Sequence, residues 1–188
     1  KIYNIFKGTG LAKKYEYIWM CGDSLRFYEG AINKLQQYLI DKPDIVVMDI
    51  MNSEHLGLKR YTDKNEFFDD CAWYLTLYGA AVINADTMLD KVNWDEMIYK
   101  YLSEETFNYS QIGLYFEQIN KLKDFEGIHI ALQYNEGHMT KMYKRNGWYR
   151  DCIRIMCKGW INTVNILPDT YTNKKETILK LGRYSGTF

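Results

Sequence analysis

The chain has 188 residues, of which 47% are hydrophobic and 26% charged, so its length and composition suit one globular domain with a sizeable core. Its 24 basic and 24 acidic side chains cancel, so no overall field recruits nucleic acid, and we expect no nucleic-acid partner. The sequence has no apolar run of about 18 residues and no charged-then-apolar leader. We therefore expect no transmembrane segment, no secretion and a cytoplasmic location.

The chain begins with a polar stretch over residues 1–14. Its Gly8-Thr9-Gly10 spacing is similar to a phosphate cradle, but no strand precedes it and no helix follows, so the pattern predicts a loop. Residues 15–20 are rich in aromatic and β-favouring side chains and predict a buried strand that runs into Gly22. Asp23 therefore follows the C-terminal end of a strand, where open α/β sheets bind their ligands.

The next two patterns complete a unit of strand, acidic loop, helix and strand. Residues 28–40 carry apolar side chains at helical spacing, which predicts a helix. An apolar run over residues 45–50 follows the turn-favouring pair Pro43-Asp44 and predicts a second strand.

An amphipathic helix and a short buried strand are predicted next. The helix, over residues 63–77, begins with the capping signal of Asp63 and Glu66, three residues apart. The strand, over residues 80–83, leads to Asp86. Asp86 either lies in a binding cleft at the end of this strand or caps the turn that follows it, and the sequence leaves both open.

The second half of the chain is predicted to be mainly helical. Helical spacing covers four segments, residues 93–102, 109–122, 148–167 and 173–181. One further strand is predicted over residues 128–132, in which alternation places His129 on the face opposite Ile128 and Ile130.

Charged side chains accompany two of these helices. Glu104 and Glu105 stand just before the second helix, where they either act chemically or stabilise the helix N-terminus by their charge. Arg145, Arg150 and Arg154 accompany the third helix and form either a solvated face or a set of cations facing a diphosphate.

Cysteines and aromatic residues are open to two interpretations. The four cysteines are Cys21, Cys71, Cys152 and Cys157. They lack the short paired spacing of zinc sites, so we interpret them as reduced core thiols. The aromatic content of 16% serves either the core or a sugar-binding surface.

The residues around Asp23 resemble a known family. Tyr-Ile-Trp at residues 17–19, Gly-Asp at 22–23 and Lys-Pro-Asp-Ile-Val-Val at 42–47 follow one another in the order, and at approximately the spacing, of that family. In this they are similar to the nucleotide-sugar-dependent glycosyltransferases of the GT-A fold, especially the family-two-like enzymes that build bacterial capsules and surface glycans. The likeness continues more loosely through residues 79–84 and 160–171.

The resemblance implies a fold and a division of the chain. The fold is α/β, with a GT-A-like, mostly parallel sheet flanked by helices, and with further helices added at the C-terminus. The chain is one domain over residues 1–188, with the sheet and the metal and donor side over residues 1–90 and the acceptor side over residues 91–188. Such enzymes begin with a strand and loop that hold the nucleotide base, so we expect that part to be missing from this chain.

The resemblance also implies an activity, which is transfer of a sugar from a nucleotide-diphosphate donor to a glycan, glycoprotein or lipid-linked acceptor. Asp23 would bind Mg²⁺ or Mn²⁺, and Asp23, Ser24 and Asp86 would contact the donor. Glu104 or Glu105 would be the base that takes the proton from the acceptor hydroxyl. A lipid-linked acceptor would bring the chain to the inner face of the membrane without a membrane span.

One departure from the family supports a rival function. The family usually places a second aspartate shortly after the first, whereas Ser24 and Leu25 follow Asp23 here. This favours a non-catalytic domain that keeps the fold and binds a partner or a glycan.

A second rival comes from Gly-Asp-Ser-Leu at residues 22–25, the signature of GDSL-type esterases, in which the serine is the nucleophile. Those enzymes need a histidine with an aspartate three residues before it, and none of the three histidines here has one. Without that base Ser24 is not activated, so the esterase is the less favoured interpretation.

Overall fold

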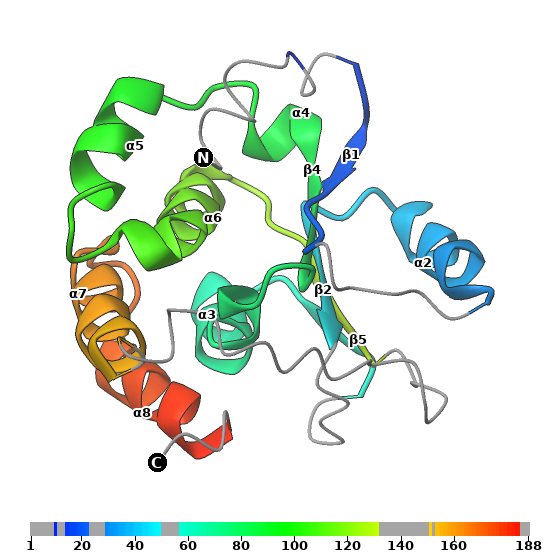
Figure 1. Cartoon of the computed structure of the whole chain (residues 1–188). Coiled ribbons are helices and arrows are strands. Elements are labelled where there is room, and N and C mark those ends of the chain that lie inside the picture. The colour runs from blue at the N-terminus through cyan, green and yellow to red at the C-terminus, as the bar shows by residue number, and fades with distance from the viewer. Residues whose placement is uncertain are drawn as a thin grey trace.

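The structure is a computed structural model that describes residues 10, 14–22, 29–49, 57–131, 151 and 153–184. These residues form an α/β fold built on a five-stranded mixed sheet (Figure 1). The strands lie in the order β1 (Tyr17–Trp19), β4 (Ala81–Asn84), β2 (Ile45–Asp49), β5 (Gly127–Ala131) and β3 (Lys59–Tyr61). The α/β class expected from the sequence is therefore confirmed.

The direction of the strands differs from the expectation. β4 pairs antiparallel with β1 and with β2, and β3 pairs antiparallel with β5, while β2 and β5 are parallel. The mostly parallel sheet is thus not confirmed, because three of these four pairings are antiparallel. The reason lies in the connections: β4 follows a tight turn at Gly79, whose φ is 94°, and inserts between β1 and β2 against their direction. The apolar patterns that predicted each strand contain no information about its direction.

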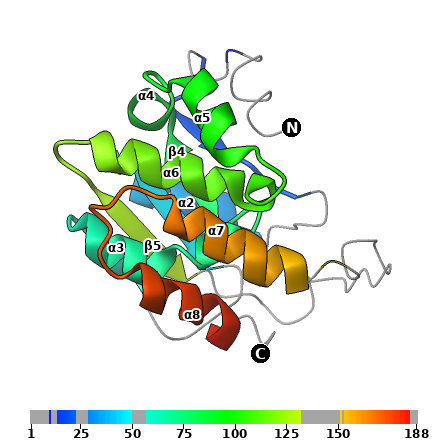
Figure 2. The same cartoon turned by 90° about the vertical axis from the view of Figure 1, so that its left-hand side faces the viewer.

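Helices cover both faces of the sheet, as expected. α2 (Ala31–Leu39) lies on one face, while α3 (Lys64–Cys71) and α6 (Ser110–Lys121) lie on the other (Figure 1). α7 (Trp160–Asn165) and α8 (Lys174–Tyr184) pack against α6 and α3 as an outer layer, which Figure 2 shows from the side. The shorter helical elements are η2 (Tyr74–Thr76), α4 (Ala85–Met88), α5 (Trp94–Tyr101), η3 (Phe107–Tyr109) and the π-helix η5 (Arg154–Gly159).

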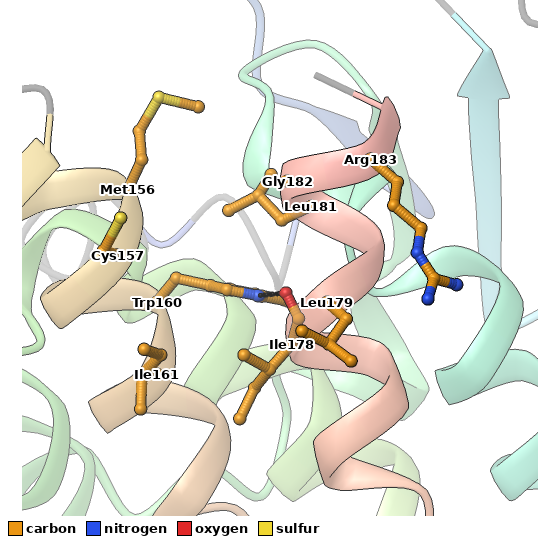
Figure 3. Close-up of a pocket in the computed structure, with 9 residues that line it drawn as sticks. All are labelled: Met156, Cys157, Trp160, Ile161, Ile178, Leu179, Leu181, Gly182 and Arg183. Carbon is orange, nitrogen blue, oxygen red and sulfur yellow. Dashed lines mark hydrogen bonds between the residues drawn. The ribbon is translucent and has the colours of Figure 1, made fainter. Parts of the chain in front are cut away.

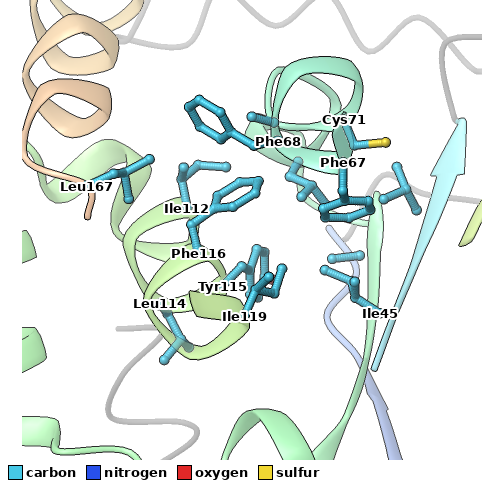
Figure 4. Packing of buried hydrophobic residues seen from close by; sticks show 14 of the residues in the cluster. Ile45, Phe67, Phe68, Cys71, Ile112, Leu114, Tyr115, Phe116, Ile119 and Leu167 are labelled. Carbon is cyan, nitrogen blue, oxygen red and sulfur yellow. The ribbon is translucent and has the colours of Figure 1, made fainter. Parts of the chain in front are cut away.

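The larger hydrophobic core lies between the sheet and helices α3 and α6 (Figure 4). Its centre is aromatic: the Phe68 and Phe116 rings meet edge-on at 5.0 Å, and the Phe67 and Phe125 rings at 5.1 Å. A smaller cluster on the α2 face contains Leu35 with Ile128 and Ile130. Every residue of β2 is buried, because the strand is covered on both sides.

Side-chain caps mark where the predicted helices begin. Asp63 Oδ1 accepts the backbone N–H of Glu66 at 2.8 Å, so α3 begins where the capping signal predicted. The helix predicted over residues 148–167 starts, in its described part, with the π-helix η5 and continues as α7. None of the helices in the described part of the chain is long and apolar enough to cross a membrane.

Candidate functional site

The carboxyl ends of three strands meet at one edge of the sheet. β1 and β2 are both antiparallel to β4, and β5 is parallel to β2, so these three strands run the same way. Trp19 at the end of β1 reaches the turn before β4, where its Nε1 donates to the carbonyl oxygen of Gly79 at 2.8 Å. Asp23 and Ser24 lie outside the described residues, but the chain reaches Gly22 at this edge. We call it the carboxyl edge.

Asp86 lies at the other end of the sheet. Asn84, the last residue of β4, pairs with Tyr17, the first residue of β1. The Asn84 side chain caps α4 by accepting the backbone N–H of Asp86 at 3.0 Å. The cap is therefore Asn84, and the alternative that Asp86 caps this turn is wrong. Asp86 is exposed and follows β4 at the end of the sheet where β1 begins, whereas Gly22 follows the other end of β1.

Glu104 and Glu105 lie in the turn between α5 and η3, at the beginning of α6. Gln111, in the first turn of α6, donates its side-chain N–H to the carbonyl oxygen of Thr76 at 3.3 Å. Thr76 precedes the Gly79 turn by three residues, so this end of α6 lies on the side of the carboxyl edge. In Figure 2 the first turns of α6 and α7 lie on the same side of the molecule.

The two glutamates have different surroundings. Glu105 Oε1 is 2.7 Å from Lys158 Nζ, and Glu105 Oε2 accepts a hydrogen bond from Asn162 at 3.2 Å, so both oxygens hold η5 and α7 in place. Glu104 is exposed and makes no hydrogen bond or ion pair with any described residue. Of the two, Glu104 is the carboxylate that is free to meet a ligand.

Glu104 lines a small polar pocket of about 190 Å³. Its lining residues are Glu104, Glu105, Asn108, Arg154, Lys158 and Gly159. Arg154 Nε lies 3.4 Å from the Asp151 carboxylate, so each cation of the pocket has an acidic neighbour and the pocket has no excess charge. Carboxylate, amide and guanidinium groups of this kind are hydrogen-bond partners for the hydroxyl groups of a polyol.

Sequence reasoning missed three members of this pocket, Asn108, Lys158 and Gly159. Lys158 follows Arg154 by four residues, a spacing that places both on one side of a helix and could have predicted the pair. Asn108 carried no such signal.

A buried polar pair near the carboxyl edge also escaped the sequence analysis. Asp49, the last residue of β2, and His129 of β5 are both fully buried. His129 Nδ1 lies 2.8 Å from the carbonyl oxygen of Gly57, and its Nε2 has no partner among the described residues. Burial lowers the pKa of His129, so its imidazole is neutral near neutral pH. The prediction that His129 faces away from Ile128 and Ile130 is confirmed, because its ring meets Tyr74 at 5.0 Å on the opposite face.

Two expectations about ligating side chains have different outcomes. Cys21, Cys71 and Cys157 are free thiols, but the prediction that they lie in the core holds only for Cys71, because Cys21 is exposed and Cys157 is partly exposed. Burial raises the pKa of Cys71 well above its ordinary value, and Cys152 lies outside the described residues. Within the ranges that the structure describes, no three histidine, cysteine, aspartate or glutamate side chains gather into a metal site. Asp23, the expected metal ligand, is not in those ranges.

Comparison with known proteins adds no relative. No family model matches the chain, no curated protein matches it in sequence, and no solved structure matches its fold.

Proposed function

We propose that this chain is a glycosyltransferase domain of GT-A type, which moves a sugar from a nucleotide-diphosphate donor to a glycan or lipid-linked acceptor. The observation that carries the proposal is the position of Glu104. Its carboxylate is free of described partners, lines a polar pocket and lies on the side of the molecule where the chain runs from β1 toward Asp23.

Glu104 has the properties that a catalytic base requires. An alcohol is a poor nucleophile near neutral pH, so the acceptor hydroxyl must lose its proton to a positioned base as it attacks the anomeric carbon. In our proposal the proton passes to the Glu104 carboxylate while the bond from the sugar to the diphosphate breaks. Glu105 acts as a positioning residue, because its contacts to Lys158 and Asn162 fix the wall of the pocket.

The donor side of the proposal rests on Asp23 and Ser24. These residues continue the chain beyond Gly22 at the carboxyl edge, the position where open α/β sheets bind ligands. Asp23 would hold Mg²⁺ or Mn²⁺, hard cations that prefer oxygen ligands and that stabilise a leaving diphosphate. Asp86 lies at the opposite end of β1, so we leave it out of the proposed donor site.

The proposal predicts a specific effect of removing the base. With a panel of UDP-, GDP- and dTDP-sugars and Mn²⁺, Glu104→Gln should lower kcat by roughly 10²- to 10⁴-fold and leave donor affinity unchanged. Asp124→Asn, an exposed carboxylate beyond the other end of α6, is the matched control and should keep full turnover. Unchanged turnover in Glu104→Gln would refute the assignment of the base.

The same assay tests the donor site and the rival functions. Asp23→Asn should abolish metal-dependent donor binding, whereas Asp86→Asn should not. Donor or glycan binding without turnover would favour the non-catalytic domain instead. The esterase alternative predicts ester hydrolysis that is lost in Ser24→Ala.

A further inference from the structure

Helix α8 is attached to the rest of the fold by a narrow buried contact. Among the side chains of α8 that the structure describes, only Thr177 and Leu181 are buried, and one of these two is polar. The core helix α6, in contrast, buries every residue from 110 to 119. Since burial of apolar side chains is the main term that keeps a helix in place, α8 is held less firmly than α6.

The packing between α8 and α7 is incomplete. An apolar groove of about 310 Å³ lies between them, with Met156 and Trp160 on one side and Leu179 and Leu181 on the other (Figure 3). Side chains along a groove lack partner atoms on one side, so the dispersion attraction between the two helices is weaker than in a close-packed contact. One hydrogen bond crosses the groove, from Trp160 Nε1 to the carbonyl oxygen of Ile178 at 3.2 Å (Figure 3).

A lysine fastens α8 to α3. Lys180 Nζ lies 2.9 Å from the Asp69 carboxylate and 4.0 Å from the Asp70 carboxylate, and it donates to the backbone carbonyl oxygen of Asp69 at 2.8 Å. Thr177 Oγ1 also donates to Asp69 Oδ1, at 3.5 Å. The Lys180 side chain is only 19% exposed, so its ion pairs are less screened by water than those of a fully exposed lysine.

The other partner of this contact, α3, is held firmly without α8. Phe67 and Phe68 of α3 are buried in the larger core. The second oxygen of Asp70 is 2.6 Å from Lys59 Nζ and accepts a hydrogen bond from the Tyr61 hydroxyl at 3.2 Å, and both of these residues belong to β3. Asp69 and Asp70 are therefore fixed points to which α8 is attached.

The chain is also fixed just before α8. Tyr171 is buried, and its hydroxyl donates to a backbone carbonyl oxygen of α6 at 2.8 Å. The backbone N–H of Thr172 donates to Asn65 Oδ1 at 2.9 Å, and Lys174, the first residue of α8, donates to the carbonyl oxygen of Leu167 at 2.7 Å. A helix that is fixed at its first residue and weakly held along its length can swing away about its first turn.

We infer that α8 is a strap that opens as a unit about its first turn while the sheet, α3 and α6 stay folded, and that Lys180 controls how often it opens. Proteins open locally in cooperative units, and units with few buried apolar contacts open at the lowest cost. Opening breaks the Lys180 ion pairs and uncovers Trp160 together with the apolar walls of the groove. Because the fastening is ionic, the ionic strength controls how much apolar surface this side of the molecule exposes.

Hydrogen exchange of the full chain, followed by mass spectrometry at constant pH and temperature, tests the inference. Protection factors of the amides at residues 178–183 should be at least about ten-fold lower than those of α6, which exchanges only when the whole fold opens. Raising NaCl from about 0.1 M to about 1 M, which shortens the screening length from about 10 Å to about 3 Å, should lower the protection of α8 at least about two-fold and leave α6 unchanged.

Lys180→Gln should lower the protection of α8 about ten-fold, the effect of losing charge-assisted hydrogen bonds at a partly shielded site, and should abolish the salt effect. Lys175→Gln is the matched control and should leave protection unchanged. Lys175 lies on the same helix, is exposed and makes no hydrogen bond or ion pair with any described residue.

Three results would overturn the inference. Equal protection of α8 and α6 in the unaltered chain would mean that α8 opens only with the whole fold. Equal protection of α8 in Lys180→Gln and Lys175→Gln, or a salt effect that persists in Lys180→Gln, would mean that Lys180 does not control the opening. The experiment contains no sugar donor, so its outcome is independent of the proposed function and of the Glu104 turnover assay.

Discussion

Replacing Gly113 by alanine should destabilise the fold, although alanine is the better helix former. Gly113 is the fourth residue of α6, where alanine would gain up to roughly 1 kcal/mol of intrinsic helix propensity. A Cβ added at Gly113, however, would lie 2.3 Å from Cδ1 and 2.4 Å from Cγ of Tyr101. Ordinary contacts between carbon atoms are more than 1 Å longer than this, so the Tyr101 ring or α6 itself must move.

The Tyr101 ring has little room to move. It is fully buried, and its hydroxyl donates to Glu117 Oε1 at 2.7 Å. Overpacking of a core costs about 1–3 kcal/mol, and loss of a hydrogen bond to a charged acceptor costs about 1.5–3 kcal/mol. If the hydrogen bond is only partly lost, the net destabilisation after the gain in propensity is about 2 kcal/mol. For a chain of this size that corresponds to a melting temperature lower by about 4–8 °C.

Urea unfolding followed by far-ultraviolet circular dichroism measures this change. Gly159→Ala is the matched control, because a Cβ there would meet its nearest neighbours at 3.5 Å, an ordinary contact, and should be neutral or stabilising. In a Tyr101→Leu background the penalty of Gly113→Ala should shrink, since the clashing ring is gone. A Gly113→Ala protein as stable as the unaltered chain would refute the reasoning, because it would mean that α5 and α6 are not packed at this distance.

Three further substitutions test other parts of the structure. Asp63→Ala removes the cap of α3 and should lower the free energy of unfolding by about 1 kcal/mol in the same urea assay, whereas Asp63→Asn should lose less. Glu105→Gln should lower the free energy of unfolding by less than about 1 kcal/mol, because the side chains of Glu105 and Lys158 are 56% and 60% exposed. A larger decrease would show that this ion pair is not a surface contact. His129 has its pKa lowered by burial, so stability should be complete above about pH 6.5 and fall as the pH drops from there toward the folded-state pKa. Melting temperatures from pH 7.5 to 5 should show that fall, and His129→Gln should reduce it.

The sequence predicted the elements of this fold better than their arrangement. Local composition predicts the strands at residues 45–49 and 81–84 and the cap at Asp63. A strand buried on both faces is a short run of apolar residues, and a side-chain cap involves residues only three positions apart. The insertion of β4 between β1 and β2 depends on contacts between residues about 40 to 60 positions apart, such as Trp19 with Gly79, and no local pattern encodes those.

The site shows the same limit. Spacing alone could not separate Glu104 from Glu105, because adjacent carboxylates before a helix look alike in sequence. What separates them is the pair of contacts from η5 and α7, where Lys158 and Asn162 engage Glu105 and leave Glu104 free. Asp86 and Asp23 each follow a predicted strand, but β4 runs antiparallel to β1, and a sequence pattern does not contain that direction.

Strand direction therefore decides which acidic residues can act together in this chain. β1, β2 and β5 end at the carboxyl edge, whereas β4 ends at the opposite end of the sheet. Asp49 lies at the carboxyl edge, as the last residue of β2. Glu104 lies in the turn before η3 and α6, and the hydrogen bond from Gln111 to Thr76 holds the start of α6 on the side of the carboxyl edge, although about 80 residues separate Glu104 from Gly22.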